Sequence, residues 1–297
     1  MELQTLIDKL SAACRKFGLC ISQSKTKVMA QNAEIAPCIS IDGQPLEVVK
    51  DFCYLGSKIS NDVLMTKDIN NRIAKAMGTM SLLQKRVWGN ALLTITTKCL
   101  VYRTCILSTL LYGSEAWTTY SWQEKKLNTF HLRCLRRILG IKWQDKITNA
   151  QVLHRAGCQD IRVVLSQRRL SWLGHVHRMP QGRLPQDILY GELPEGRRPT
   201  GRPTLRYVDV LKRDMKHLHI NSSNWEREAQ DRPTWRANIK EGAWMAVEDH
   251  AEGGKRAANS KTPVSLLCAH CDRTCASNIG LFSHERSCKG KRSSCET

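Results

Sequence analysis

Apolar residues near the start of the chain recur at spacings of three and four positions. This spacing predicts an amphipathic helix over residues 3–17, which should end at Gly18. The residues on the apolar face are Leu3, Leu6, Ile7, Leu10 and Cys14.

Short runs of β-like composition follow this helix. They cover residues 19–22, 27–29, 38–41 and 46–49. The Asp42-Gly43 pair between the last two runs is typical of a tight hairpin turn. We therefore expect a small region of mixed helix and strand at the N-terminus.

From Asp68 onward the apolar positions take a helical period. The positions that carry it are Ile69, Ile73, Met77, Met80, Leu83 and Val87. Further helices are expected over residues 95–112, 122–139, 160–178 and 208–218. The predicted fold class is mainly α, with a small α+β region at the N-terminus and a small metal-binding unit at the C-terminus.

The composition changes after residue 180. Gly, Pro and Arg are frequent in residues 180–203, which include most of GRRPTGRPTLR (196–206). This composition predicts an extended connector. A piece with Trp225, Trp235 and Trp244 follows, and small polar residues at 249–263 predict a tether. The expected domains are residues 1–60, 61–180, 181–263 and 264–292.

Length and charge narrow the class of protein. The chain has 297 residues, and a hydrophobic content of 41% is enough to bury a core. Its formal net charge is +19 and its pI is about 9.6. Such a surface attracts polyanions, so nucleic acid is the first candidate partner, with a solvated basic surface as the alternative.

The basic residues are concentrated in one stretch. Between Lys125 and Arg178, twelve Lys and Arg face two acids, which is 12 − 2 = +10. Some of these arginines share helix faces and could track a phosphate backbone. Those of the connector could lie along a backbone or enter a minor groove, although a solvated connector is the more common case. The candidates are Arg133, Arg136, Arg137, Arg162, Arg169, Arg197, Arg198 and Arg202.

Two tryptophans lie in the same basic stretch. Trp143 and Trp172 could stack on bases, although a lone tryptophan is more often a core residue.

No secretory signal and no apolar run near 20 residues is present in the sequence. We therefore expect an intracellular protein, nuclear or cytoplasmic, with no membrane contact. In that setting the thirteen cysteines should be thiols and metal ligands, and the eight from Cys14 to Cys158 should be buried in the core.

The stretch CAHCDRTCASNIGLFSHERSC near the C-terminus predicts a zinc finger. Cys268 and Cys271 lie three apart, His284 and Cys288 lie four apart, and twelve residues separate the pairs. A Cys-x-x-Cys turn and a helical pair four apart can complete a tetrahedron around a structural Zn²⁺. Cys275 is interpreted as a small buried hydrophobe instead of a ligand.

The finger should read bases poorly. The helix positions that usually contact bases are Ser277, Gly280 and Ser283, and none of them offers a bidentate contact. Phosphate binding and protein contact remain as alternative roles for the finger.

Several stretches together resemble the reverse transcriptases of non-LTR (LINE-like) retrotransposons. CRKFGLCISQSKTKVMAQ (14–31) and IDGQPLEVVKDFCYLGS (41–57) are similar to the end of the palm in that family. The segments after the palm are matched, in order, by LLYGSEAW (110–117), RCLRRILGI (133–141), RRLSWLGHVHRM (168–179), GRRPTGRPTLRYVD (196–209) and DRPTWR (231–236). Tyr207 departs from the tryptophan expected after the GRP segment.

The resemblance implies roles for residues 1–60 and 61–180 as a palm remnant and a helical thumb. It implies that Phe52, Tyr54, Leu55 and Gly56 match the primer grip, and that Lys25 and Lys27 match a stretch near the incoming nucleotide. The terminal Cys-Cys-His-Cys finger is typical of some members.

Polymerisation needs two metal ions held by aspartates, and the sequence has no adjacent Asp pair. We therefore expect no enzymatic activity, and the chain to begin downstream of the catalytic loop. The expected function is non-catalytic binding of RNA or DNA, largely independent of sequence. A zinc-stabilised protein-interaction module, with a possible protein partner at the finger, is the alternative, as is a decayed element without a selected role.

Overall fold

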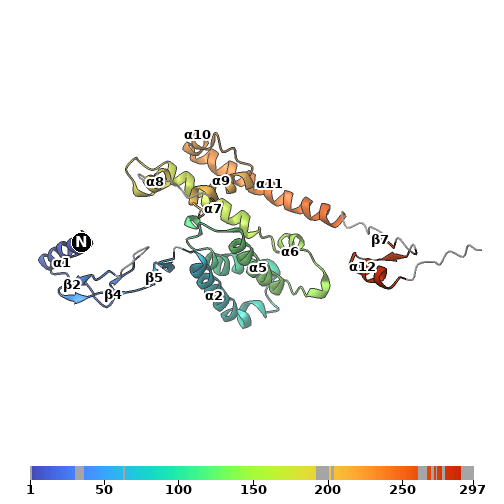
Figure 1. Cartoon of the computed structure of the whole chain (residues 1–297), viewed down its shortest axis with the longest axis horizontal. Coiled ribbons are helices and arrows are strands. Elements are labelled where there is room, and N and C mark those ends of the chain that lie inside the picture. Colours follow the sequence, from blue (N-terminus) through green and yellow to red (C-terminus); the bar gives the residue numbers. More distant parts are fainter. Residues whose placement is uncertain are drawn as a thin grey trace, which may run out of the picture. The chain divides into compact units, whose positions relative to one another are not determined.

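The structure is a computed structural model that describes residues 2–30, 37–62, 64–191, 201, 204–259, 266–268, 271, 273–275 and 278–288. The chain divides into two compact units, Met1–Val247 and Glu248–Thr297. The described residues are mainly helical, as predicted, with a small mixed module at the N-terminus and a Cys/His cluster near the C-terminus (Figure 1).

The N-terminal module contains α1 (Glu2–Lys16) and four two-residue strands. β1 (Lys27–Val28) pairs in parallel with β4 (Glu47–Val48), and β2 (Ser40–Ile41) pairs antiparallel with β3 (Gln44–Pro45). The predicted helix and hairpin are confirmed, while residues 19–22 form no strand. A small apolar cluster holds the module together: Ile7, Ile21, Val28, Ile39, Ile41 and Leu46.

The turn of the β2–β3 hairpin has the geometry that its sequence predicts. Asp42 and Gly43 have φ values of 51° and 79°. This left-handed conformation is one that Asp and Gly adopt more readily than most residues, and it matches the twist of the paired strands.

A second hairpin leads into the helical layers. β5 (Asp51–Tyr54) pairs antiparallel with β6 (Ser57–Ser60), and β6 packs on α2 (Thr66–Leu82). The buried Asp68 carboxylate accepts the Lys58 N–H at 2.8 Å, and Arg72 donates to the Ser57 hydroxyl at 2.8 Å. Polar contacts therefore fix the hairpin on the helix.

The first hydrophobic cluster is built by helices between residues 66 and 165. The expected helix over 95–112 is present but passes through a π-helical segment, and a π-helical turn also follows α2. The elements are η1 (Gln84–Trp88), α3 (Ile95–Val101), η2 (Tyr102–Leu107), α4 (Ser108–Leu110), η3 (Ser114–Ala116), α5 (Ser121–Ile138), η4 (Trp143–Asp145) and α6 (Asn149–Ala156).

Helix α6 was not predicted from the sequence. It has only eight residues, which is too short for a clear apolar period. Local signals define it instead, because the Thr148 hydroxyl caps its start and Gly157, at φ 58°, ends it.

The second hydrophobic cluster is built around the C-terminal half of α7 (Ile161–His177). Trp235 is its largest member, and its indole N–H donates to the Leu170 carbonyl at 2.9 Å. A Cβ on Gly174 would lie 2.3 Å from that indole nitrogen, so only glycine fits there. The other helices are α8 (Leu184–Tyr190), α9 (Tyr207–His217), α10 (Trp225–Gln230) and α11 (Arg232–Asn259).

Two expectations for the region after residue 180 are wrong. The connector is not extended throughout, because residues 184–190 form α8, whose Tyr190 hydroxyl bonds to His177 Nδ1 at 2.7 Å. The expected tether after residue 249 is helical as far as Asn259, because α11 continues through it. Ala, Glu and Lys, which recur in this stretch, have a high helix propensity and suit a helix as well as a linker.

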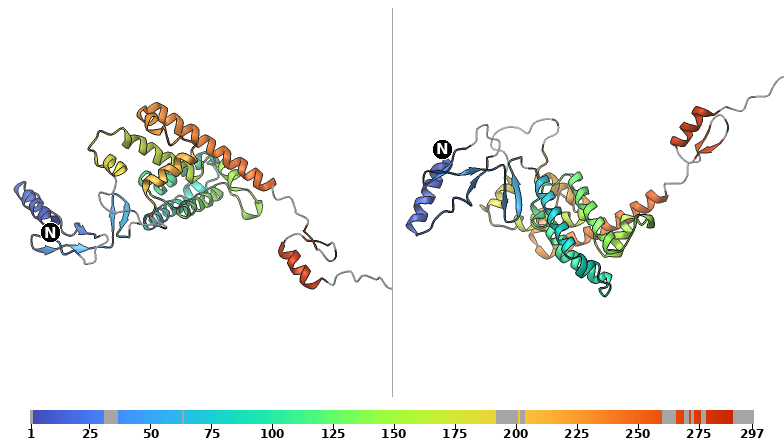
Figure 2. Two further views of the ribbon diagram at one scale, coloured as in Figure 1. Left: turned by 45° about the horizontal axis from the view of Figure 1, so that its top comes forward. Right: turned by 90° about the horizontal axis from the view of Figure 1, so that it is seen from below.

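Helix α7 belongs to both hydrophobic clusters. Ile161 and Leu165 lie in the first, and Leu170 and Leu173 lie in the second. The helix contacts α5 on one side and α9 and α10 on another, which Figures 1 and 2 show from three directions. The two clusters therefore share one continuous helix.

A buried ion network lies where the clusters meet. Arg169 on α7 is 0% exposed, and its Nε donates to the Asp214 carboxylate of α9 at 2.5 Å. Its Nη2 donates to Glu124 of α5 at 3.2 Å, and Arg213 reaches the same Glu124 oxygen at 2.5 Å. Burial alone would lower the pKa of Arg169, but Asp214 and Glu124 raise it above its usual value.

This network corrects one nucleic-acid contact predicted from the sequence. Arg169 was expected on an exposed face with Arg162, but its guanidinium is enclosed by two carboxylates and cannot reach a phosphate. No local pattern indicates this burial, because the partners lie 45 positions away on either side.

The prediction for the eight cysteines from Cys14 to Cys158 is also partly wrong. Cys99 and Cys134 are buried, but four thiols are exposed: Cys20, Cys38, Cys53 and Cys105. Two of these, Cys20 and Cys38, lie outside any helix or strand, where a small side chain can be exposed at little energetic cost.

His131 is a buried histidine of the first cluster. Its Nδ1 lies 2.8 Å from the Tyr102 hydroxyl, and its Nε2 lies 3.2 Å from the Gln159 carbonyl. The carbonyl can only accept, so Nε2 carries the hydrogen and Nδ1 accepts from Tyr102. Desolvation lowers the pKa of His131 to about 4, which keeps the ring neutral.

Among the described residues, no helix combines the length and the apolar content that crossing a bilayer requires.

We predict that Arg169→Ala lowers the free energy of unfolding by about 3 to 5 kcal/mol, because it leaves two buried carboxylates without their cation. Arg206→Ala is the control, since Arg206 is 61% exposed in its ion pair with Asp209 and should contribute less than about 1 kcal/mol. Urea titrations of the full chain measure both. Equal losses for the two variants would contradict a special role for the buried network.

We predict that His131 makes the fold sensitive to acid. The pKa of His131 is about 4 in the folded chain and about 6.5 in the unfolded chain. Between pH 6.5 and pH 4, the unfolded chain therefore binds a proton at this histidine that the folded chain does not bind. Stability is therefore present above pH 6.5 and is lost as the pH falls toward 4, by up to about 3 kcal/mol. Urea titrations at several pH values should show a shallower loss for His131→Gln than for the native chain, and parallel losses would refute the assignment.

Candidate metal centre and basic helix face

The C-terminal unit places four metal-ligating side chains around one point. β7 (Leu266–Leu267) pairs antiparallel with β8 (Thr274–Cys275), and α12 (Asn278–Ser287) follows. The first cysteine pair lies at the hairpin turn, where the Cys268 N–H donates to the Arg273 carbonyl at 3.0 Å. His284 lies on α12, and Cys288 is the first residue after the end of this helix.

The four ligand atoms lie within 4.8 Å of one another. The Cys268 and Cys288 sulfurs are 3.8 Å apart, and the Cys271 sulfur lies 3.1 Å from His284 Nε2. Ligands at about 2.3 Å for sulfur and 2.0 Å for nitrogen around one ion would be separated by about 3.5 to 3.8 Å. The three thiols and the imidazole are therefore gathered closely enough to hold one ion, on the residues predicted from the sequence.

Crowding of these thiols has an electrostatic consequence. A hydrogen bond with Cys271, desolvation, and a further hydrogen bond with Cys268 raise the pKa of Cys288 to about 12. The thiol is then protonated at neutral pH until a cation replaces its proton. Metal binding must therefore release protons.

The finger helix presents few groups that could read a base. Of the three positions predicted to face nucleic acid, Gly280 and Ser283 lie on α12, and Ser283 is exposed. Ser277 lies outside the described residues. Glycine has no side chain and serine makes no bidentate contact, so neither of these two positions can discriminate bases well.

Helix α5 carries a solvent face without acidic residues. Its one acid, Glu124, is buried in the ion network, so the exposed side is purely basic or neutral. The side chains at spacings of three, four and seven on this face are Trp122, Lys125, Lys126, Thr129, Arg133, Arg136 and Arg137. We call this surface the α5 basic face.

The predicted arginines fall into different environments. Arg133 and Arg137 are exposed on the α5 basic face, whereas Arg136 is half-buried and donates to the Ile147 carbonyl and to Asn149 at 3.0 and 2.9 Å. Arg162 is half-buried near the start of α7. Arg197, Arg198 and Arg202 lie outside the described residues.

The two tryptophans singled out in the sequence also differ. Trp143 is 86% exposed in the loop after α5, where a base could stack on it. Trp172 is half-buried on the outer face of α7.

The primer-grip-like residues occupy the β5–β6 hairpin. Phe52 is half-buried and pairs across the strands with Ile59, while Tyr54 and Leu55 are 59% and 74% exposed. Leu55 and Gly56 form the turn with φ values of 48° and 83°. Their role in gripping a primer stays a prediction.

One comparison with known proteins finds a relative. The chain is 28% identical over 263 residues to a Caenorhabditis elegans protein whose name describes it as transposon-derived, with 80% of this chain and 87% of the relative covered. No protein-family model matches the chain. No solved structure matches it either.

We predict that Cys268, Cys271, His284 and Cys288 hold one divalent ion together. Titration of the full chain with Co²⁺ should give the visible absorption of a tetrahedral thiolate complex, because three thiolates and an imidazole surround the ion. Cys288→Ser should weaken or abolish it. Cys53→Ser removes an exposed thiol of β5 and should leave it unchanged; a full signal in Cys288→Ser would exclude Cys288 as a ligand.

Proposed function

We propose that the chain is a non-catalytic nucleic-acid-binding fragment of a retrotransposon-type reverse transcriptase, carrying a structural zinc finger. The transposon-derived relative supports an origin in a mobile element. The finer assignment to a non-LTR reverse transcriptase rests on the ordered sequence stretches between residues 14 and 236.

The α5 basic face is the observation that carries nucleic-acid binding. Four exposed Lys and Arg side chains, those of Lys125, Lys126, Arg133 and Arg137, lie on a helix of 18 residues, about 27 Å long, which can face several consecutive phosphates. The buried position of Glu124 removes the one acid that would oppose them. A surface of this kind binds the backbone through counterion release and has little dependence on base sequence.

Zinc is the metal we propose for the C-terminal site. Soft thiolate ligands with one imidazole favour Zn²⁺ over Mg²⁺ or Ca²⁺. Four protein ligands complete a tetrahedron, so the ion would stabilise the small unit and would hold no reactive water. The residues that would hold it are Cys268, Cys271, His284 and Cys288.

The proposal includes no catalytic step and no membrane contact. Two-metal polymerisation uses carboxylates that the sequence does not place side by side, since it contains no adjacent Asp pair. The many free thiols support an intracellular setting, nuclear or cytoplasmic.

A protein-interaction module is the second candidate. The observation that favours it is an exposed aromatic on the finger, because Phe282 on α12 is 69% exposed and exposed aromatic side chains are common at protein interfaces. Under this alternative the finger would bind a protein partner, and the α5 basic face would be irrelevant to binding.

We predict that the full chain binds single-stranded RNA or DNA with an affinity that falls as salt rises. Replacing Arg133 and Arg137 by alanine should weaken binding of all sequences and reduce the slope of log K against log salt by about 1 to 2, because two phosphate contacts are lost. Fluorescence anisotropy at several salt concentrations measures this.

The matched control replaces Arg232 and Arg236, two exposed arginines of α11, by alanine. It lowers the net charge by the same amount and should leave the slope nearly unchanged. Equal effects of the two double variants would show that only total charge matters and would remove the α5 basic face from the proposal.

A further inference from the structure

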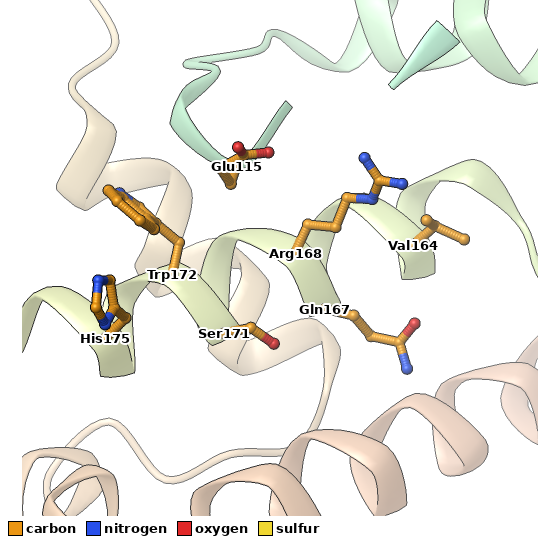
Figure 3. Close-up of a pocket in the computed structure, with 7 residues that line it drawn as sticks. All are labelled: Glu115, Val164, Gln167, Arg168, Ser171, Trp172 and His175. Carbon is orange, nitrogen blue, oxygen red and sulfur yellow. The ribbon is translucent and has the colours of Figure 1, made fainter. Parts of the chain in front are cut away.

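The outer face of α7 lines a groove, and this groove is separate from the α5 basic face. Its volume is ≈ 490 Å³, which is within the range of sites for small molecules. Figure 3 shows the side chains that line it, most of them from one stripe of α7. They are Glu115, Val164, Gln167, Arg168, Ser171, Trp172 and His175.

The walls of this groove are held by contacts within the protein. The Arg168 guanidinium donates to the Leu111 carbonyl and, at 3.4 Å, to the Ser114 hydroxyl. The Tyr207 hydroxyl donates to the Glu115 carbonyl oxygen at 2.6 Å. The turn η3 is therefore fixed between α7 and α9, and the Glu115 side chain is carried on a fixed backbone.

The polar groups in the groove are available to a ligand. Within the described part of the chain, no hydrogen bond or ion pair engages the Glu115 carboxylate, the Gln167 amide or the Trp172 indole N–H. The Trp172 and His175 rings lie 5.1 Å apart and are tilted by 49°. In Figure 3 the Trp172 ring and the Glu115 carboxylate lie on the same side of α7, and the Gln167 amide points away from them.

We propose that this groove binds one unpaired nucleobase of the bound strand, stacked on Trp172, and that Glu115 selects guanine. The proposal rests on the nucleic-acid binding proposed above and adds a base-reading site to it. Single-stranded bases are commonly recognised by stacking on aromatic rings and by hydrogen bonds to their edges.

The Glu115 carboxylate would determine which base the groove prefers. Guanine presents two adjacent N–H donors, at N1 and at the exocyclic amine, and a carboxylate can accept both. Thymine and uracil present one N–H between two carbonyl oxygens, which a carboxylate repels. Adenine presents a single amine beside a ring acceptor, so it offers one hydrogen bond and one unfavourable contact.

The experiment compares two oligonucleotides on the full chain. One is a short oligothymidylate, and the other is the same oligomer with one central guanine. The guanine oligomer should bind about ten-fold more tightly to the native chain, because stacking and edge contacts are added to the backbone contacts.

Three variants separate the contributions. Trp172→Ala and Glu115→Gln should each bring the ratio of the two oligomer affinities close to one, and Trp172→Phe should restore part of the preference for guanine. Trp244→Ala, which removes a 69% exposed tryptophan of α11, is the control and should keep the preference. Circular-dichroism melts verify that each variant is folded.

The outcomes distinguish the two proposals. If the native chain binds both oligomers equally, or if Glu115→Gln keeps the full guanine preference, the base site is refuted while backbone binding on α5 stands. If neither oligomer binds, the proposed function and the base site fail together. If the Arg133 and Arg137 double variant loses affinity for both oligomers but keeps their ratio, the two surfaces act independently, as proposed.

Discussion

The guanidinium of Arg169 lies where the two hydrophobic clusters of the helical unit meet, enclosed by carboxylates from α5 and α9. A buried cation is stable only when its charge is compensated and its N–H groups are satisfied, so Glu124 and Asp214 must both remain in place. Because α7 runs through both clusters, this one contact fixes how α5 and α9 are placed against it. The other features of the unit depend on that placement.

The surface charge follows from the same arrangement. Glu124 is drawn into the interior to neutralise Arg169 and Arg213, and this leaves the solvent side of α5 with basic and neutral residues alone. The opposite face of α7 turns outward beside η3 and forms the groove around Trp172. The same buried network therefore lies between the two surfaces to which we assign binding. We assign phosphate binding to the α5 basic face and base stacking to the groove around Trp172.

The finger is stabilised by a different kind of interaction. Its elements are two short strands and one helix, which cannot bury a sizeable core, and its ligand atoms converge instead on one point. The helical unit, by contrast, is held by apolar clusters and internal ion pairs.

The sequence by itself determined the features that depend on neighbours in the chain. The periods of α1, α5 and α7, the Asp42-Gly43 turn and the Cys/His spacing all involve residues a few positions apart, or a metal that brings two such pairs together. The comparison with a transposon-derived protein agrees with the origin that the motifs indicated. Short elements such as α6 and α8 were missed, since eight or fewer residues carry little periodic signal.

Only the tertiary structure decided which polar residues face the solvent. Arg133 and Arg169 are both arginines on helices of a basic stretch, and no local pattern distinguishes them; one is exposed and the other is enclosed by acids 45 positions away in either direction. The groove at Trp172 likewise needs Glu115 from a distant turn. Long-range pairing of charges sets these outcomes, because a charge is buried only where the fold brings its counter-charge beside it.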